Sequence, residues 1–171
     1  MKLLVTGGAG FIGSNFINYV LENHDDIESI LNADCLSYAS NERNCNKFKS
    51  NPKYFFRHLD ITRTPQVNDV FRRYSPTHVV HFAAESHVDN SIKNPNIFIE
   101  TNVMGTNNLL KAAISNKVKR FHHISTDEVY GSLGQRGKFK ETTPYDPRNP
   151  YSASKAASDH LVRAFHHTFG S

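Results

Sequence analysis

The chain has 171 residues, which at roughly 150 residues per domain predicts one domain and excludes a second full-sized one. Hydrophobic residues make up 38% and charged residues 21%, a composition that excludes intrinsic disorder and permits a packed core. The formal net charge is +4, and the basic residues fall in small groups, which excludes the dense basic stripe typical of nucleic-acid binding.

No apolar run approaches the ~20 residues of a membrane span, and the N-terminus does not show the pattern of a signal peptide. The two cysteines, Cys35 and Cys45, lack the spacing of a metal site or of a redox pair, which predicts a reducing compartment. We therefore expect a cytoplasmic protein with no membrane partner and no nucleic-acid partner.

Short apolar runs alternate with helix-periodic segments from the N-terminus onward. The first run, at 2–6, predicts a strand that ends at two glycines, and a helical period follows at 11–21. Further strands are predicted at 27–33, 54–59, 78–84 and 120–125, and further helices at 65–74, 95–115 and 151–169. Segment 36–51 is predicted as loop with at most one short helix, and 131–150 as a surface loop.

Strands that alternate with helices predict right-handed β-α-β crossovers. Such crossovers place the strands parallel to one another and put helices on both faces of the sheet. The predicted fold class is therefore α/β, with a doubly wound parallel sheet of the Rossmann type.

Three glycines, Gly7, Gly10 and Gly13, separate the first predicted strand from the first helix. In this pattern the first permits a tight turn, the second lets backbone approach a pyrophosphate, and the third allows close packing of helix on sheet. Asp34 follows about 20 residues later, where a carboxylate accepts hydrogen bonds from both ribose hydroxyls and repels a 2′-phosphate. The pattern predicts an NAD site in preference to an NADP site.

The ends of the third and fourth predicted strands carry weaker signals. Asp60 and Ile61 are placed to flank an adenine ring, but the pair is equally a turn signal. The run at 82–86 contains small residues, which would let a flat cofactor lie close to the backbone. Such residues also suit close packing in a core.

Tyr151 and Lys155 lie four residues apart on one face of the last predicted helix. To act as a base near neutrality, a phenol needs its pKa lowered from ~10 by roughly three units, which nearby positive charge can supply. Lys155 and an oxidised nicotinamide ring would both contribute such charge. The same spacing also occurs by chance in many helices.

Two adjacent carboxylates, Asp127 and Glu128, follow Thr126 after the fifth predicted strand. Both can serve one pocket only if the chain has left the strand by Thr126, because successive strand residues point to opposite faces. Two carboxylates near one ligand push their pKa values apart, which makes one acid and one base available. A Thr-Asp-Glu run also commonly serves as a helix cap.

The ten histidines include the adjacent pairs at 122–123 and 166–167. Neighbouring residues of a strand face opposite ways, and the sequence has no His-Glu-x-x-His motif. We therefore expect structural histidines and no metal site.

In this order, the motifs resemble the extended short-chain dehydrogenase/reductase superfamily, and within it the nucleotide-sugar 4,6-dehydratases that act on dTDP-glucose or UDP-glucose. The 4-epimerases and glucuronate decarboxylases of that superfamily typically lack the Asp-Glu pair. The motifs that carry the resemblance are Thr6-Gly-Gly-Ala-Gly-Phe-Ile-Gly13, Ala83-Ala-Glu-Ser-His-Val-Asp89, Glu100-Thr-Asn-Val103, Thr126-Asp-Glu-Val-Tyr-Gly131 and Tyr151-Ser-Ala-Ser-Lys155.

The resemblance implies a role for each catalytic residue. Tyr151 would take the proton of the sugar 4-hydroxyl, Lys155 would lower its pKa and hold the nicotinamide ribose, and Thr126 would hydrogen-bond near O4. Glu128 would remove the C5 proton, and Asp127 would protonate the departing 6-hydroxyl. The implied product is a 4-keto-6-deoxy nucleotide sugar, a precursor of rhamnose and other deoxysugars.

The resemblance also implies NAD as cofactor and substrate contacts at Ser86 and Thr126. One departure is Asn90, where relatives commonly carry arginine. The implied cofactor contacts are Gly7, Gly10, Phe11, Ile12, Gly13, Asp34, Cys35, Leu36, Ser37, Asp60, Ile61, Phe82, Ala83, Ala84, Glu85, Ser86, Thr101, Tyr151 and Lys155.

Members of the family run to roughly twice this length. On the resemblance, residues 1–171 are expected to be the NAD-binding domain with its catalytic residues, and the smaller C-terminal substrate domain to be largely missing. A homodimer packed through 95–115 and 151–169 is also implied. Two alternatives stay open, namely a 4-epimerase or other extended reductase, and an NAD-binding module without catalysis.

Overall fold

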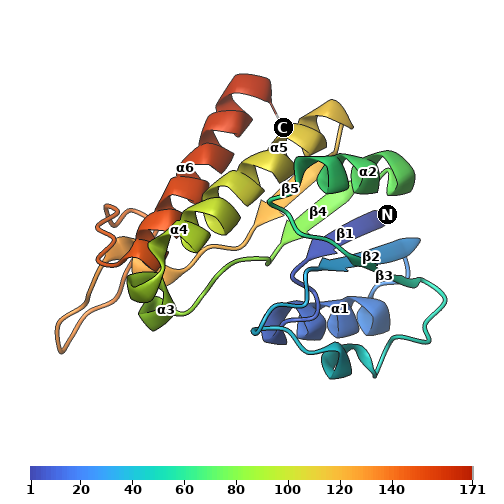
Figure 1. The fold of residues 1–171 in the computed structure, drawn as a ribbon, viewed down its shortest axis with the longest axis horizontal. Helices are drawn as coiled ribbons and strands as arrows, with labels where there is room; N and C mark the ends of the chain where they lie inside the picture. Colours follow the sequence, from blue (N-terminus) through green and yellow to red (C-terminus); the bar gives the residue numbers. More distant parts are fainter. Residues whose placement is uncertain (171) are drawn as a thin grey trace.

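The computed structural model describes residues 1–170 and contains a parallel five-stranded sheet with the strand order β3-β2-β1-β4-β5 (Figure 1). The order reverses between β1 and β4, the point at which α/β sheets of this type bind ligands. The predicted doubly wound parallel sheet is confirmed. The strands are β1 (Lys2–Thr6), β2 (Ser29–Asp34), β3 (Tyr54–His58), β4 (His78–His81) and β5 (Arg120–His123).

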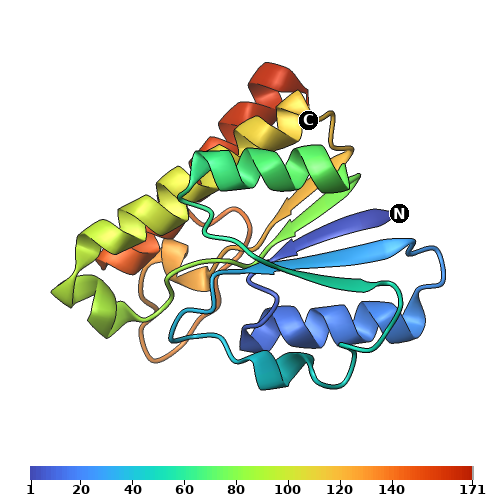
Figure 2. The same ribbon diagram turned by 45° about the vertical axis from the view of Figure 1, so that its right-hand side comes forward.

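Helices cover both faces of the sheet (Figures 1 and 2). On one face lies α1 (Phe11–Asn23) together with the short η1 (Glu42–Cys45), and on the other lie α2 (Thr64–Tyr74), α5 (Thr106–Ser115) and α6 (Pro150–Phe169). Alternation along β1 divides the core, because Leu3 and Val5 pack beneath α1 while Leu4 packs toward α2 and α5. One core cluster thus packs on each face of the sheet, and the strands are held between the two.

The helix predicted at 95–115 is helical throughout but is not one regular α-helix. It consists of α4 (Pro95–Phe98), a π-helical segment η2 (Ile99–Gly105) and α5. The wider turn lets Asn102 aim its side chain at the backbone of Glu85, and Gly105 packs closely on Ile61. A β-carbon at Gly105 would lie 2.6 Å from the Ile61 side chain. These tertiary contacts override the regular period.

The strands β4 and β5 end at His81 and His123, before their predicted ends at 84 and 125, and the residues that follow are loop. Smaller differences are that β2 begins at Ser29 and β3 ends at His58. The helix α3 (Val88–Lys93) and the 3₁₀ turn η3 (Asp127–Tyr130) carry no apolar period that would predict them. The helix α6 begins where expected, because Asn149 and Ser152 form a capping box around Pro150.

Within the part of the chain that the structure describes, no helix combines the length and the apolar character that crossing a membrane requires. Cys35 is exposed and Cys45 is buried, and neither forms a disulfide bond.

Candidate active site

A cavity of about 390 Å³ opens at the carboxyl ends of the strands, where the strand order reverses. Every cofactor position named from the sequence lines it except Leu36, whose side chain packs against the core beneath α1. Six further lining residues were not predicted as cofactor contacts, although four of them stand inside motifs or strand runs identified from the sequence. These six residues are Ala39, Ser40, Leu59, His87, Ile124 and Ser125.

The glycine loop leaves space that side chains would fill. Gly7 has φ +72°, and a β-carbon there would lie 2.6 Å from the backbone nitrogen of Ala83. A β-carbon at Gly13 would lie 2.4 Å from the Gly7 carbonyl oxygen, so this glycine lets α1 approach the loop. Gly10 caps α1 without a side-chain hydrogen bond, which leaves the N–H donors of the first turn for an anion. The loop therefore fits a pyrophosphate.

Asp34 is held rigidly at the end of β2. One carboxylate oxygen accepts a hydrogen bond from the Ala9 amide at 2.9 Å, and the other accepts from the Leu36 amide at 2.8 Å. The side chain lines the cavity, so its remaining lone pairs can accept from ribose hydroxyls. Phe11 and Ile12 also line the cavity, and they are 79% and 62% exposed, so apolar side chains stand at its rim. These residues fit a dinucleotide.

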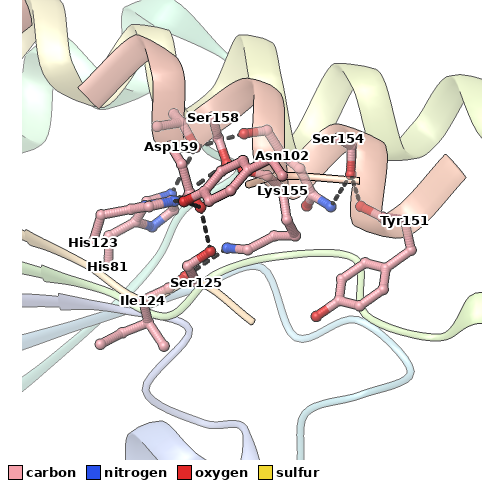
Figure 3. A network of polar contacts seen from close by, with 12 residues as sticks. His81, Asn102, His123, Ile124, Ser125, Tyr151, Ser154, Lys155, Ser158 and Asp159 are labelled. Atoms are coloured by element: carbon pink, nitrogen blue, oxygen red, sulfur yellow. Dashed lines mark hydrogen bonds and ion pairs between the residues drawn. The ribbon is translucent and has the colours of Figure 1, made fainter. Parts of the chain in front are cut away.

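Tyr151 and Lys155 project from the first turns of α6 into the cavity (Figure 3). The Lys155 ammonium donates a hydrogen bond to the carbonyl of Ile124 at 2.6 Å, and burial lowers its pKa to about 8 while Asp159 raises it. Burial raises the pKa of Tyr151, a hydrogen bond with Thr126 lowers it, and Glu128 raises it again. The net shift is upward, so Tyr151 becomes a base only when positive charge arrives beside it.

The chain has left the sheet by Thr126, as the use of both carboxylates in one pocket requires. Thr126 is extended and caps η3, because its hydroxyl accepts a hydrogen bond from the Glu128 amide at 3.3 Å. Glu128 in turn accepts from the Asn149 side chain at 3.1 Å, and both carboxylates act electrostatically on Tyr151. The run therefore caps a helix and keeps both carboxylates near Tyr151, although Thr126, Asp127 and Glu128 are not among the residues that line the cavity.

Asn102 joins the π-helical segment to the cavity wall, a role that the sequence did not reveal although the residue stands inside a quoted motif. Its side chain accepts from the Glu85 amide at 2.8 Å and donates to the Glu85 carbonyl at 2.9 Å. It also donates to the Ser154 hydroxyl at 2.9 Å, and Ser154 donates to the Tyr151 carbonyl at 2.7 Å (Figure 3). This chain of contacts fixes the loop after β4 against the helix that carries Tyr151.

A second buried chain of hydrogen bonds passes through His81. Burial lowers the pKa of His81 well below its usual range, so the ring is neutral. Thr106 donates to the Asn102 carbonyl at 2.6 Å and so must accept from His81 Nε2–H at 3.0 Å. The other nitrogen, Nδ1, then accepts from the Thr6 hydroxyl at 2.7 Å. The bonds fix the tautomer and tie the glycine loop to η2.

No group of three or more histidine, cysteine, aspartate or glutamate side chains within residues 1–170 is arranged to hold a metal ion. On β5, His122 is exposed while the side chain of His123 is buried against α6, as the alternation of a strand requires.

A family model described as GDP-mannose 4,6 dehydratase matches residues 4–171. A dTDP-glucose 4,6-dehydratase from Neisseria meningitidis is 49% identical over 99% of this chain and 50% of its own length. A solved dTDP-glucose 4,6-dehydratase from Streptomyces venezuelae, with NAD bound, has a TM-score of 0.94 at 44% identity, covering 99% of this chain and 53% of that one. A UDP-glucose 4-epimerase from Thermus thermophilus, also with NAD, has a TM-score of 0.89 at 32% identity, covering 99% of this chain and 52% of the other.

The chain thus spans about half the length of the curated relatives that it matches.

Proposed function

The chain belongs to the GDP-mannose 4,6 dehydratase family, and from this membership and the site we propose that it supplies the cofactor-binding and catalytic part of a dTDP-glucose 4,6-dehydratase. One observation carries the proposal: a Tyr-Lys pair lines the cavity, and two adjacent carboxylates, Asp127 and Glu128, lie close enough to Tyr151 to raise its pKa. Oxidation of an alcohol alone requires neither carboxylate, whereas removal of water requires both an acid and a base.

NAD is the proposed cofactor, and when bound it accepts hydride from sugar carbon 4 and returns it to carbon 6. The glycine loop binds its pyrophosphate, and Asp34 accepts from the adenosine ribose. Lys155 holds the nicotinamide ribose and keeps a positive charge close to Tyr151. The dinucleotide-binding halves of the NAD-bound relatives support this assignment, since their fold is shared over nearly the whole chain.

The proposed reaction divides between two sets of side chains. Tyr151 removes the proton of the 4-hydroxyl as carbon 4 becomes a ketone, with Thr126 hydrogen-bonded near that oxygen. The ketone makes the carbon 5 proton acidic, and Glu128 removes it while protonated Asp127 donates to the 6-hydroxyl, which leaves as water. Glu128 then returns its proton to carbon 5 as carbon 6 is reduced. Tyr151 releases its proton to solvent and Asp127 regains one, so the site is restored.

The protein that carries this chain at its full natural length is the material for the test. It is incubated with dTDP-glucose labelled with deuterium at carbon 4, and with UDP-glucose in parallel. A 4,6-dehydratase gives a product one water lighter that keeps the deuterium at carbon 6. A 4-epimerase gives no change in mass, and a binding module without catalysis gives no product. Either of these two results contradicts the proposal.

Replacement of Glu128 by glutamine is expected to separate oxidation from loss of water. The amide keeps the size of the side chain but cannot take the carbon 5 proton, so we expect product formation to fall by roughly 10²–10⁴-fold. The oxidised sugar should accumulate with reduced cofactor, which absorbance in the near ultraviolet records. Glu141→Gln, at an exposed glutamate, removes the same charge as a control. Equal rates in both variants would refute a base at this position.

Asp34→Asn is expected to weaken NAD binding by about 10- to 100-fold, because the charged acceptor of the ribose hydroxyls is lost. It should also narrow the preference for NAD over NADP, since repulsion of the 2′-phosphate disappears. Calorimetric titration with both cofactors measures each effect. Asp25→Asn is the matched control at an exposed aspartate before β2. An unchanged ratio of NAD to NADP affinity would contradict the assignment of Asp34.

We also propose a homodimer packed through the helices at 95–115 and 151–169. Exposed apolar side chains on this helical layer support it, and they are Ile97, Ile99, Met104 and Phe169. Sedimentation equilibrium at micromolar concentration should report twice the mass of one chain. A single-chain mass would contradict the dimer.

The proposal places the cofactor and catalytic groups in residues 1–171 and the remaining substrate contacts in the half of the relatives that this chain does not match. It assigns Ser86 and Thr126 to the sugar. The two free thiols support a cytoplasmic location, which fractionation of the cell would test.

A further inference from the structure

A buried carboxylate stands one helical turn after Lys155 on α6 and has no part in the proposed reaction. The side chain of Asp159 is 8% exposed. Its Oδ2 accepts from the Ser125 hydroxyl at 2.5 Å and from the Tyr145 hydroxyl at 2.9 Å (Figure 3). Three segments therefore meet at one carboxylate, namely the end of β5, the loop before α6, and α6 itself.

His123 does not neutralise this carboxylate. The His123 Nε2 atom lies 3.2 Å from Asp159 Oδ1 and also 3.2 Å from the Ser158 hydroxyl. Ser158 donates to the Lys155 carbonyl at 2.8 Å, so it must accept from Nε2–H. Burial lowers the pKa of His123 although Asp159 raises it, so the ring is neutral and its contact with Asp159 Oδ1 is not a charged pair. Burial raises the pKa of Asp159, but the His123 ring, Ser125 and Tyr145 lower it, and the net shift is downward, so the negative charge persists.

The charge of Asp159 acts on Lys155. Residues at i and i+4 of a helix are neighbours on one face, and Asp159 opposes the loss of the Lys155 proton that burial favours. Both histidines nearby are neutral, because burial lowers their pKa values. The titratable groups that interact with Tyr151 or Lys155 are Asp159 on α6, Asp127 and Glu128 on η3, His81 on β4 and His123 on β5.

Asp159 also acts on the position of the carboxylate pair. Ser125 directly precedes Thr126, from which Asp127 and Glu128 follow, so its hydrogen bond to Asp159 fixes the start of this run against α6. We propose that Asp159 is a positioning residue for the reaction, with a buried carboxylate that keeps Lys155 charged at the Ile124 carbonyl and aligns the Thr126 run with Tyr151. This inference rests on the proposed function.

The test compares three variants of the full-length protein loaded with NAD. Asp159→Asn removes the charge at almost the same side-chain volume. Asp159→Glu keeps the charge on a side chain that is one methylene longer. Tyr145→Phe removes one hydrogen bond to the carboxylate and leaves the charge. If the asparagine variant does not fold, Asp159→Ser removes the charge and still offers a hydroxyl to Ser125. The rate of 4-keto product formation is measured against pH, and the Lys155 pKa is read by NMR with ¹³C-labelled lysine.

Loss of the charge lowers the Lys155 pKa, so Lys155 loses its proton at a lower pH. We expect the alkaline limb of kcat to move down by roughly one pH unit in Asp159→Asn, and the NMR titration of Lys155 to move with it. Asp159→Glu and Tyr145→Phe should keep the limb near its original position, with at most a lower kcat. The same limb and titration in Asp159→Asn as in the parent, or an equal shift in Tyr145→Phe, would overturn the inference.

The two readouts keep this inference separate from the proposed function. If the parent protein makes no 4-keto sugar, the proposed function fails. The lysine titration then still decides whether Asp159 keeps Lys155 charged.

Discussion

Tyr151→Phe is expected to abolish the first step of the reaction while leaving the cofactor in place. Removal of the phenolic oxygen leaves no group to take the 4-hydroxyl proton, and loss of a positioned base costs roughly 10²–10⁴-fold in rate. The ring keeps its half-buried place beside Phe98, with ring centroids 6.3 Å apart in the parent, so the fold should be retained. Stopped-flow absorbance should show no reduction of bound NAD when dTDP-glucose is added.

Tyr19→Phe makes the same change at a phenol that is 59% exposed on α1, away from the cavity lining, and it should react like the parent. Calorimetry should give the same NAD affinity for both variants. If Tyr151→Phe reduced its cofactor at more than a tenth of the parent rate, another base would have to be found. Glu128→Gln provides the contrast, because it should stop the reaction after reduction of the cofactor.

Gly7→Ala is expected to cost both stability and cofactor binding. The residue has φ +72°, which an L side chain rarely adopts, and the added β-carbon would meet the Ala83 backbone at 2.6 to 2.8 Å. The backbone at Gly7 and the backbone at Ala83 cannot move apart without distorting the sheet ends that carry them. We therefore expect the free energy of unfolding to fall by roughly 2–4 kcal/mol. The shift needed to relieve the contact would move the loop after β4, so NAD binding should weaken as well.

Gly134→Ala is the matched control, because nothing lies within 4 Å of the β-carbon it would add. Denaturant titration and calorimetric titration with NAD measure the two effects on both variants. Equal stability and equal NAD affinity in the two variants would show that the loop after Gly7 adapts, contrary to the close approach seen in the structure.

Local signals in the sequence were sufficient for the sheet and for most of the cavity. The glycines at 7, 10 and 13 and the aspartate that ends β2 act through backbone geometry close to their own positions, so short spacing predicts them. The cofactor positions other than Leu36 line the cavity for the same reason. Their roles as cofactor contacts and catalytic groups remain predictions until the variants above are measured.

What the sequence did not predict depends on contacts between distant segments. The π-helical turn of η2 places the Asn102 side chain against the backbone of Glu85, and no periodicity encodes that pairing. In the sequence, Asp159 looks like any polar residue of an amphipathic helix. Its hydrogen bonds with Ser125 and Tyr145 are visible only in the structure. The residues that follow β4 and β5 leave the sheet and line the cavity, although the sequence predicted them as strand.

The hydrogen bond between Thr6 and His81 joins residues 75 positions apart, and the one between Asn102 and Ser154 joins residues 52 positions apart. Closing such large loops costs entropy before any contact is gained, which makes parallel sheets slow to form. During synthesis the glycine loop leaves the ribosome early, but the wall opposite it is completed only when α6 emerges. We therefore expect the nascent chain to hold no cofactor until Lys155 has been made, so cofactor capture waits for segments far apart in the sequence to assemble.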